Sequence, residues 1–374
     1  MKLRCQGKDF LRTLNIVIRA IATKPTLPIL ANILIDAKDD GVELTGYNME
    51  AGIRCHIDAD VADPGQVAVP AKMLQEIVSN LAEEEFDFEF KDVSQVTIKT
   101  PSSNYKLAGR PGEDYPNLPE FTDRDEQVVL PIDIFNNYLR KVIFASSAEM
   151  SKTFTSGILM EFVKDKLSIV ATDGRRLALM EADLPSGRKA KKDIRALVPG
   201  EVMTDLNRIL AGDFKGDIEI SISPTLAGFK FDEVEVISHL MDVSFPDYRK
   251  VIPTDLKGSL VVDRQAFIRS LKGVAIMAKL REGRDMAVVS TKGKELSVTS
   301  SVENVGSAHE KLPVEKDGDD MKVAFNYNFL LDPLNSIDEE KVTLQYSGAL
   351  DPGVLKVPEI PGYTYVIMPV RLAE

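Results

Sequence analysis

The fold is decided by a stretch that recurs three times: LTGYNME at 44–50, VATDGRRLA at 170–178 and VTSSVEN at 298–304. In these stretches Thr45, Thr172 and Thr299 stand 127 residues apart, about a third of the 374-residue chain. A repeat on that scale indicates one architecture built three times. Such an architecture typically makes an extended surface rather than a single catalytic cleft.

Two further sets of segments keep the same phase. The first set is DFLRTLNIVIRAI, DIFNNYLRKVIFA and DRQAFIRSLKGVA, starting at Asp9, Asp133 and Asp263. The second set is VPAKMLQEIVSNL, VPGEVMTDLNRIL and FNYNFLLDPLNSI, starting at Val69, Val198 and Phe325. We therefore predict three domains over 1–125, 126–255 and 256–374. Each domain is expected to hold two helices and antiparallel strands in an α+β fold.

The first unit shows the predicted order of elements most clearly. One face of a helix predicted over 7–22 carries Phe10, Leu14, Val17 and Ile21, and a second helix is predicted over 70–82. Alternating apolar residues beside these helices predict half-buried strands. Short polar turns close the predicted hairpins, at Asp39, Asp40 and Gly41, at Lys164 and Asp165, and at Lys292 and Gly293.

The composition limits the class of protein. Lys and Arg number 46 against 58 Asp and Glu, which gives a net charge of −12. That balance argues against a protein that grips nucleic acid over its whole surface, but leaves room for a local basic stripe. Two cysteines are too few for a disulfide framework. No apolar stretch reaches the roughly 20 residues of a membrane span and no signal-peptide pattern is present, so we expect a cytoplasmic protein.

Basic side chains recur on the polar face of the helix that opens each unit. Their helical spacing keeps them on one side of each helix. Recurrence in phase with the repeat favours one positive wall over three unrelated solvated faces, and such a wall attracts phosphates without reading bases. The set is Lys8, Arg12 and Arg19 on the first helix, Arg140 beside Asn137 and Lys141 on the second, and Arg269 and Lys272 on the third.

Signatures of catalysis are missing from the sequence. The GxxxxGK[ST] phosphate loop, HExxH and CxxC do not occur, and the three histidines stand alone. Asp173 with Arg176 could form an acid–base pair, but they sit in an Asp-Gly turn without a nucleophile nearby. We therefore expect no enzymatic activity, no cofactor and no metal.

Four motifs in order resemble the bacterial replicative sliding clamp, the beta subunit of DNA polymerase III. They are PTLPIL at 25–30, ATDGRRLA at 171–178, FPDYRKVIP at 245–253 and YVIMPVRL at 365–372, and DYPNLPEF at 114–121 matches too. The resemblance covers the whole chain. It implies a DNA clamp fold in which two chains close into a ring around duplex DNA, with two helices of each domain facing the hole. The ring would tether the replicative polymerase, and an ATP-dependent loader would open it.

The resemblance also implies three sets of site residues. A groove between the second and third domains would receive short linear peptides from polymerase, loader and repair proteins. Its residues are Thr155, Thr172, Gly174, Arg175, Arg176, Leu177, Pro246, Lys250, Val251, Ser347, Val366, Ile367, Met368, Pro369, Val370 and Arg371. The DNA-facing set gains Lys24, Lys72 and Phe154. At the subunit joint, Tyr105 and Leu107 would meet Ile276 and Met277 of the other chain.

Two alternatives remain open from the sequence. A monomeric repeat scaffold that binds only proteins predicts no doubling of mass and no retention on closed circular DNA. An acid–base enzyme that uses Asp173 with Arg176 predicts loss of turnover in Asp173→Asn.

Overall fold

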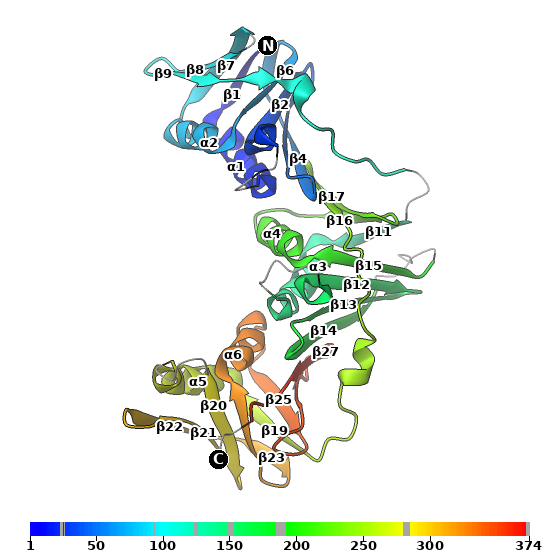
Figure 1. The fold of residues 1–374 in the computed structure, drawn as a ribbon, viewed down its shortest axis with the longest axis vertical. Helices are drawn as coiled ribbons and strands as arrows, with labels where there is room; N and C mark the ends of the chain where they lie inside the picture. Colours follow the sequence, from blue (N-terminus) through cyan, green and yellow to red (C-terminus); the bar gives the residue numbers. More distant parts are fainter. Residues whose placement is uncertain are drawn as a thin grey trace. The chain divides into compact units, whose positions relative to one another are not determined.

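A computed structural model describes residues 1–22, 25, 27–92, 94–122, 126–147, 153–184, 192–279 and 285–371 (Figure 1). The chain forms two compact units. Unit 1 takes Met1–Phe135 and Thr204–Leu240, and unit 2 takes Asn136–Met203 and Met241–Glu374. Each unit contains one nine-stranded antiparallel sheet and one smaller sheet.

The first repeat shows the order of elements that the other two follow. A strand leads into a helix, five strands follow in the first and third repeats and four in the second, and a second helix is followed by three more strands, with one further short strand in the first repeat. Its elements are β1 (Lys2–Gln6), α1 (Gly7–Val17), β2 (Asn32–Lys38), β3 (Gly41–Tyr47), β4 (Ala51–Ile57), β5 (Asp60–Asp63), β6 (Gly65–Pro70), α2 (Ala71–Asn80), β7 (Glu85–Asp92), β8 (Gln95–Lys99), β9 (Asn104–Ala108) and the short β10 (Arg110–Pro111).

The second and third repeats keep this order, which confirms the predicted threefold α+β architecture. The second repeat comprises β11 (Glu126–Pro131), α3 (Ile132–Arg140), β12 (Gly157–Val163), β13 (Lys166–Thr172), β14 (Arg176–Asp183), β15 (Ile194–Pro199), α4 (Gly200–Leu210), β16 (Asp217–Ile222), β17 (Leu226–Phe231) and β18 (Val234–His239). The third comprises β19 (Gly258–Asp263), α5 (Arg264–Ala278), β20 (Met286–Lys292), β21 (Glu295–Val302), β22 (Gly306–Pro313), β23 (Glu315–Gly318), β24 (Lys322–Asn326), α6 (Tyr327–Ser336), β25 (Lys341–Tyr346), β26 (Gly353–Val357) and β27 (Ile360–Ile367).

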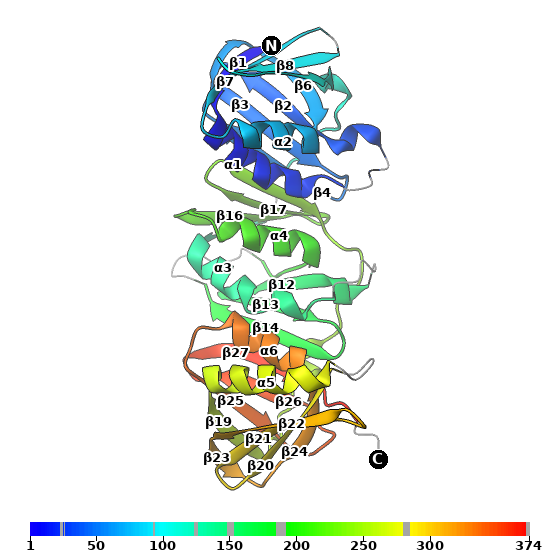
Figure 2. The ribbon, with the colours of Figure 1, turned by 90° about the vertical axis from the view of Figure 1, so that its left-hand side faces the viewer.

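Helix α1 forms because its apolar residues recur at helical spacing. Phe10, Leu14 and Val17 are fully buried, as predicted. The helix ends at Val17 and tightens into a 3-10 turn to Ala20, so it stops short of the predicted end at residue 22. Ile21 is already extended. In unit 1 α1 and α2 lie side by side, as α5 and α6 do in unit 2 (Figure 2).

Neighbouring repeats share a sheet. In unit 1 the order is β10-β6-β2-β3-β4-β18-β17-β16-β11, so β4 of the first repeat pairs with β18 of the second. In unit 2 the order is β15-β12-β13-β14-β27-β26-β25-β19-β23, so β14 of the second repeat pairs with β27 of the third. The smaller sheets are β5-β1-β7-β8-β9 in unit 1 and β22-β21-β20-β24 in unit 2.

The turns that follow β3 and β13 are alike, with four residues between Tyr47 and Gly52 and four between Thr172 and Leu177. The turn that follows β21 is shorter, with three residues between Val302 and Gly306. The turns after β3, β13 and β21 each hold one residue in the left-handed region, with φ of 74° at Met49, 83° at Gly174 and 60° at Asn304. Most side chains are disfavoured at such angles. A left-handed residue therefore recurs in all three turns, although the third turn is one residue shorter.

Candidate functional site

The sixteen residues predicted for a peptide groove all lie among the described residues of unit 2. Fifteen of them come from four places: the short 3-10 helix Phe154–Ser156, the turn between β13 and β14 with the strand ends beside it, the linker at 245–252, and the end of β27 with the residues after it. Ser347 follows β25. β14 and β27 pair directly, with Leu177 opposite Val366, and Met368 N–H donates to the Arg175 carbonyl at 3.0 Å.

The turn between β13 and β14 is held by its own side chains. Asp173 Oδ1 accepts from the backbone N–H groups of Arg175 at 2.9 Å and Arg176 at 3.0 Å. Thr172 Oγ1 accepts from Gly174 N–H at 3.0 Å and donates to the Arg176 carbonyl at 2.6 Å. These are the Asx and Thr turn bonds that fix a tight reversal. Asp173 therefore serves to hold the turn, because its carboxylate accepts hydrogen bonds from the turn's own backbone.

Arg176, one of the predicted groove residues, is turned inward. Its side chain is 9% exposed and pairs with Asp173 at 3.0 Å and with Asp332 of α6. It also donates to the Phe144 carbonyl at 2.6 Å and lies 4.3 Å from the Phe329 ring centre. Burial lowers the pKa of this guanidinium, but the hydrogen bond to Asp332 and the surrounding negative charge raise it overall. The arginine thus ties the turn to α6.

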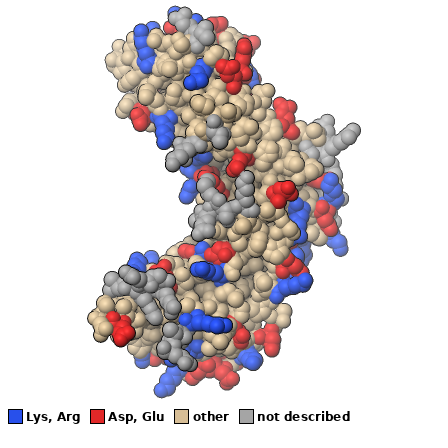
Figure 3. All heavy atoms as spheres, in the orientation of Figure 1, with Lys and Arg blue, Asp and Glu red and all other residues tan. Residues whose placement is uncertain are grey.

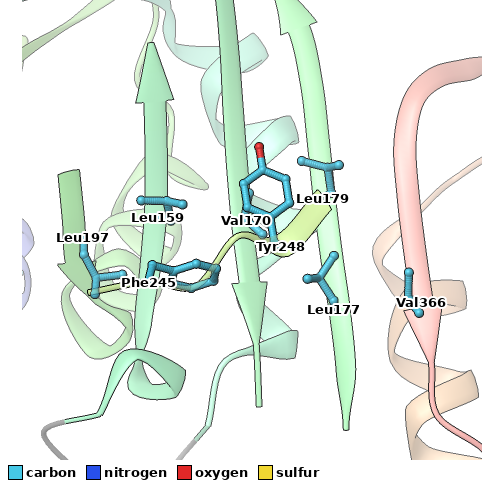
Figure 4. Packing of buried hydrophobic residues seen from close by; sticks show 8 residues of the cluster. All are labelled: Leu159, Val170, Leu177, Leu179, Leu197, Phe245, Tyr248 and Val366. Carbon is cyan, nitrogen blue, oxygen red and sulfur yellow. The ribbon is translucent and has the colours of Figure 1, made fainter. Parts of the chain in front are cut away.

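The apolar floor beneath the predicted groove is a packed cluster. Its buried members are Leu159, Val170, Leu177, Leu179, Leu197, Phe245, Tyr248 and Val366 (Figure 4). Phe245 and Tyr248 come from the linker and lie over the strands, with Phe245 beside Leu159 and Tyr248 beside Val170. Leu177 and Val366 are only 4% and 3% exposed, so they support the groove from below.

The accessible apolar surface comes from the linker and from the residue after β27. Val251 is 55% exposed and Met368 is 47% exposed, values far above those of the cluster below them. Pro246 is also exposed. Large exposed apolar side chains close to a packed floor are typical of a surface that a partner covers. Lys250 adds an exposed cation, 3.5 Å from Asp247.

The remaining predicted groove residues have structural partners. The hydroxyls of Thr155 and Thr153 share a hydrogen bond at 2.8 Å. Ser347 donates to the Asp255 carbonyl at 2.6 Å, and Val370 N–H donates to the Ala324 carbonyl at 2.8 Å. Ile367 is fully buried, whereas Pro369 is half-buried and Arg371 exposed.

Sequence reasoning missed a buried carboxylate that holds the linker. Glu161, on β12, is 8% exposed. It accepts from the Tyr248 hydroxyl at 2.9 Å and from the Arg249 guanidinium at 3.3 Å, and it pairs with Arg195 at 3.3 Å. Arg195 also donates to the Phe245 carbonyl at 2.8 Å. A lone Glu within the apolar strand GILMEFV was the available signal, because an unpaired buried charge is costly.

The basic stripe of unit 1 is partly neutralised. Arg19 pairs with Asp205 at 3.1 Å, and Arg12 lies 5.2 Å from the Phe214 ring centre. Lys8 and Lys72 are exposed and form no ion pair among the described residues. Lys24 lies outside the described residues. Because a Phe ring carries no charge, the positive charge of this stripe that no carboxylate neutralises comes from Lys8, Lys72 and Arg12 in the described part of unit 1.

In unit 2 the predicted DNA-facing residues also differ from one another. Arg140 pairs with Asp338, whereas Arg269 and Lys272 of α5 are exposed without an ion pair among the residues the structure covers. Phe154 packs edge-on against Phe245 at 5.6 Å.

The sequence placed Lys141 beside Arg140 in the exposed stripe, but the side chain of Lys141 is buried and cannot contribute to it. It is 2% exposed, it donates to Asn137, and burial lowers the pKa of its amine.

The basic residues do not merge into one field on the face that Figure 3 shows. There the Lys and Arg side chains alternate with Asp and Glu.

The four residues predicted for a subunit joint flank two strand edges. β9, which carries Tyr105 and Leu107, pairs with β8 alone, and β22 pairs with β21 alone, within the described chain. Helix α5 packs against β22. Ile276 is 65% exposed on α5, and the neighbouring Val305, which the sequence did not indicate, is 58% exposed. Leu107 is 5% exposed, and Tyr105 and Met277 are half-buried.

No helix in the described part of the chain is long and apolar enough to cross a membrane.

Profiles of one protein family match almost the whole chain. The N-terminal, central and C-terminal domains of the DNA polymerase III beta subunit match residues 1–119, 129–247 and 249–371. Among curated proteins, a beta sliding clamp of Synechocystis is 27% identical over 392 residues and covers 100% of both chains. A beta sliding clamp of Bacillus subtilis is 27% identical over 384 residues, covering 99% of this chain and 100% of the relative.

Solved structures are similar over the full length. A DNA polymerase sliding clamp from Bacillus subtilis has a TM-score of 0.93 at 26% identity, with 100% of both chains covered. A sliding clamp from Pseudomonas aeruginosa bound to griselimycin has a TM-score of 0.93 at 25% identity, again with 100% of both chains covered.

Proposed function

The chain belongs to the DNA polymerase III beta subunit family, the sliding clamps, and we propose on that premise that two copies close into a ring around duplex DNA. The ring would keep the replicative polymerase on its template during synthesis. It would recruit the clamp loader and repair proteins through short peptides. The three-domain division at 1–125, 126–255 and 256–374 is part of this proposal.

The rule by which the repeats join supports ring closure. In each repeat one strand is the third after the first helix (β4, β14 and β22), and another is the third after the second helix (β9, β18 and β27). β4 pairs with β18, and β14 pairs with β27. The same rule leaves β22 and β9 to pair with each other. A head-to-tail second copy would supply both partners and close the ring, which removes two open edges.

The apolar surface beside β22 fits this pairing. Ile276 and Val305 are two of the most exposed apolar side chains in the described part of unit 2; Ile276 lies on α5, which packs against β22, and Val305 directly precedes β22. Exposed apolar residues at an unpaired edge invite association, and a specific partner turns that liability into an interface. Tyr105 and Leu107 on β9 would face them from the second copy.

Weak contacts to phosphates suit a protein that must slide. The free cations Lys8, Lys72, Arg269 and Lys272 would meet the backbone of the duplex without reading bases. Arg19 pairs with Asp205, so its share of the charge is reduced, whereas Arg12 lies over the neutral Phe214 ring and keeps its charge. Retention would then come from topology, and the net charge of −12 would oppose side-on binding.

The peptide groove would use Val251, Met368 and Pro246 as its accessible apolar contacts. The partner would not need to present a folded helix or a strand here. A short extended peptide with one or two apolar anchors matches such a surface. The clamp itself would have no catalytic activity, and it would work in the cytoplasm.

The decisive experiment compares retention on DNA with and without free ends. The purified chain, loaded on nicked circles, should remain bound and should leave after a single cut linearises them. Equal loss from both substrates would refute encirclement. Sedimentation should show twice the chain mass. The affinity of the triple variant Lys8→Glu, Lys72→Glu and Lys272→Glu for DNA should depend less steeply on salt. Each phosphate contact contributes about −0.9 to the slope of log affinity against log salt, and the variant loses such contacts.

A further inference from the structure

The helices that open the three repeats share one register. They begin at Gly7, Ile132 and Arg264, each directly after a strand. Counted along the chain from these starts, the fourth, eighth and eleventh residues are apolar and fully buried in every repeat. They are Phe10, Leu14 and Val17 in the first, Phe135, Leu139 and Val142 in the second, and Phe267, Leu271 and Val274 in the third. Equal positions therefore correspond between repeats.

The second helices correspond in the same way. They begin at Ala71, Gly200 and Tyr327, again directly after a strand. The residues at the fourth and eleventh positions are apolar and buried in every repeat, namely Leu74 and Leu81, Met203 and Leu210, and Leu330 and Ile337. The sixth position is acidic in all three repeats and holds Glu76, Asp205 and Asp332. An acid that recurs on a register fixed by burial indicates a common kind of partner.

The acid of the second repeat binds an arginine of the first. Asp205 on α4 accepts from the Arg19 guanidinium at 3.1 Å, beside the pairing of β4 with β18 that joins these two repeats. Arg19 is the thirteenth residue counted from Gly7, the start of α1. At this junction the sixth position of a second helix therefore meets the thirteenth position of the first helix in the preceding repeat.

The acid of the third repeat is held by an arginine of the second. Arg176 of β14 donates to the Asp332 carboxylate, and it also donates to the Phe144 carbonyl at 2.6 Å. Phe144 is the thirteenth residue counted from Ile132, the start of α3. One arginine therefore bridges the sixth and the thirteenth positions here. Both junctions within the chain place these two positions side by side.

The acid of the first repeat has no such partner. Glu76 on α2 is exposed, and its carboxylate forms no ion pair with any residue that the structure describes. Only its carbonyl is used, accepting from the Asn80 amide at 3.1 Å. In the proposed ring, the repeat that precedes the first one is the third repeat of the second copy. The thirteenth position there is Ile276, which is 65% exposed on α5.

A cation lies one turn of α5 beyond Ile276. Lys279 follows three residues later, and residues at that spacing are neighbours on a helix surface. Its backbone is still in the right-handed helical region. Three residues rise by about 4.5 Å, which a lysine side chain spans. Lys279 is exposed, and it forms no ion pair within the described part of unit 2.

We propose that Glu76 of each chain binds Lys279 of the second copy and so selects that copy as the partner at the joint. The inference rests on the proposed closure of two chains into a ring. Apolar contacts such as that of Ile276 tolerate many partners, whereas a paired charge rejects a surface that offers the same sign. The Glu76 and Lys279 pair would give the joint the ionic contact that the two internal junctions already have.

Mixing two charge-reversed chains tests the pairing. Glu76→Lys alone sets two cations against each other at both joints of a homodimer, and Lys279→Glu alone sets two anions against each other. A mixed dimer of the two variants has opposite charges at both joints. If each joint discriminates by about tenfold, nearly all chains should enter mixed dimers, whereas chains without a preference give about half. Native mass spectrometry, with one chain grown on heavy nitrogen, measures this fraction.

A matched mixture controls for the reversals themselves. Glu113→Lys and Lys292→Glu reverse exposed charges of unit 1 and unit 2 that are not at the joint, and their mixture should give about half mixed dimers. Sedimentation of the wild type is run beside both mixtures. A dimeric wild type with no excess of mixed dimers from Glu76→Lys and Lys279→Glu would overturn the pairing and leave the ring. A monomeric wild type would overturn both proposals.

Neutral variants keep the test open should a reversal prevent folding. Glu76→Gln and Lys279→Gln each remove one member of the same pair. Their effects on the dimer dissociation constant should therefore not add, so that the double variant weakens the dimer about as much as either single variant. Effects that multiply in the double variant would show that the two side chains act independently and would overturn the pairing.

Discussion

Replacing Arg176 by alanine should destabilise the β13–β14 turn of unit 2 strongly, whereas the neighbouring Arg175→Ala should not. Arg176 is 9% exposed and contacts two carboxylates, one carbonyl and two aromatic rings. Removing one partner of a buried ion pair costs about 3–5 kcal/mol. Asp332 is 38% exposed and regains water when its partner is lost. We therefore place the loss at the lower end, about 3 kcal/mol.

Arg175 offers the matched control, because its side chain is exposed one position away. Surface substitutions of this kind change stability by about 0.5 kcal/mol or less. Native-state hydrogen exchange at the amides of β13 and β14 reports the local opening free energy of each variant. If Arg176→Ala opened these strands no more easily than Arg175→Ala, Arg176 would not be the tie between the turn and α6.

Three further outcomes are expected. Glu161→Gln should weaken the hold on the linker that carries Val251 by about 1–2 kcal/mol, because Glu161 accepts from the Tyr248 hydroxyl and the Arg249 guanidinium, while the more exposed Glu181→Gln should change the linker little. Hydrogen exchange at the amides of the linker at 245–252 should show this difference, and equal rates in the two variants would contradict the role of Glu161. Ile276→Asp should give monomers in sedimentation, whereas Val163→Asp, at an apolar site 40% exposed elsewhere in unit 2, should stay dimeric. Burial raises the pKa of both cysteine thiols from 9.0 to about 12, so the unfolded thiols ionise first and stability should fall as pH rises from 9 toward 12. Denaturation curves across that range should show this fall in the wild type and less of it in Cys55→Ala.

Periodicity predicted the local elements well. The burial of Phe10, Leu14 and Val17 follows from helical spacing, and the predicted turns at Asp39 and Lys164 lie where β2 and β12 end. The end of α1 was predicted too late, because Ile21 continues the apolar spacing although its backbone is extended. The spacing of apolar residues shows which of them could share one face of a helix, but it does not show where the helical hydrogen bonds end.

Partners distant in sequence could not be read from the chain. Arg19 and Asp205, 186 residues apart, form an ion pair that a helix-face pattern cannot anticipate. Lys141 follows Arg140 in the predicted stripe and yet is buried. The same limit applies to Glu161, whose partners Tyr248 and Arg249 come from a linker almost ninety residues later. The predicted groove and joint residues remain predictions that the variants above can test.

The shared sheets have a consequence for synthesis on the ribosome. Unit 1 needs residues 1–135 and 204–240 together, because β18 completes the sheet beside β4. A nascent chain therefore cannot finish its first compact body when the first repeat has emerged, and the β4 edge stays bare until β18 follows. Chains normally fold domain by domain as they are made. The interval in which β4 has emerged and β18 has not is the stage of synthesis at which a cotranslational chaperone would be needed.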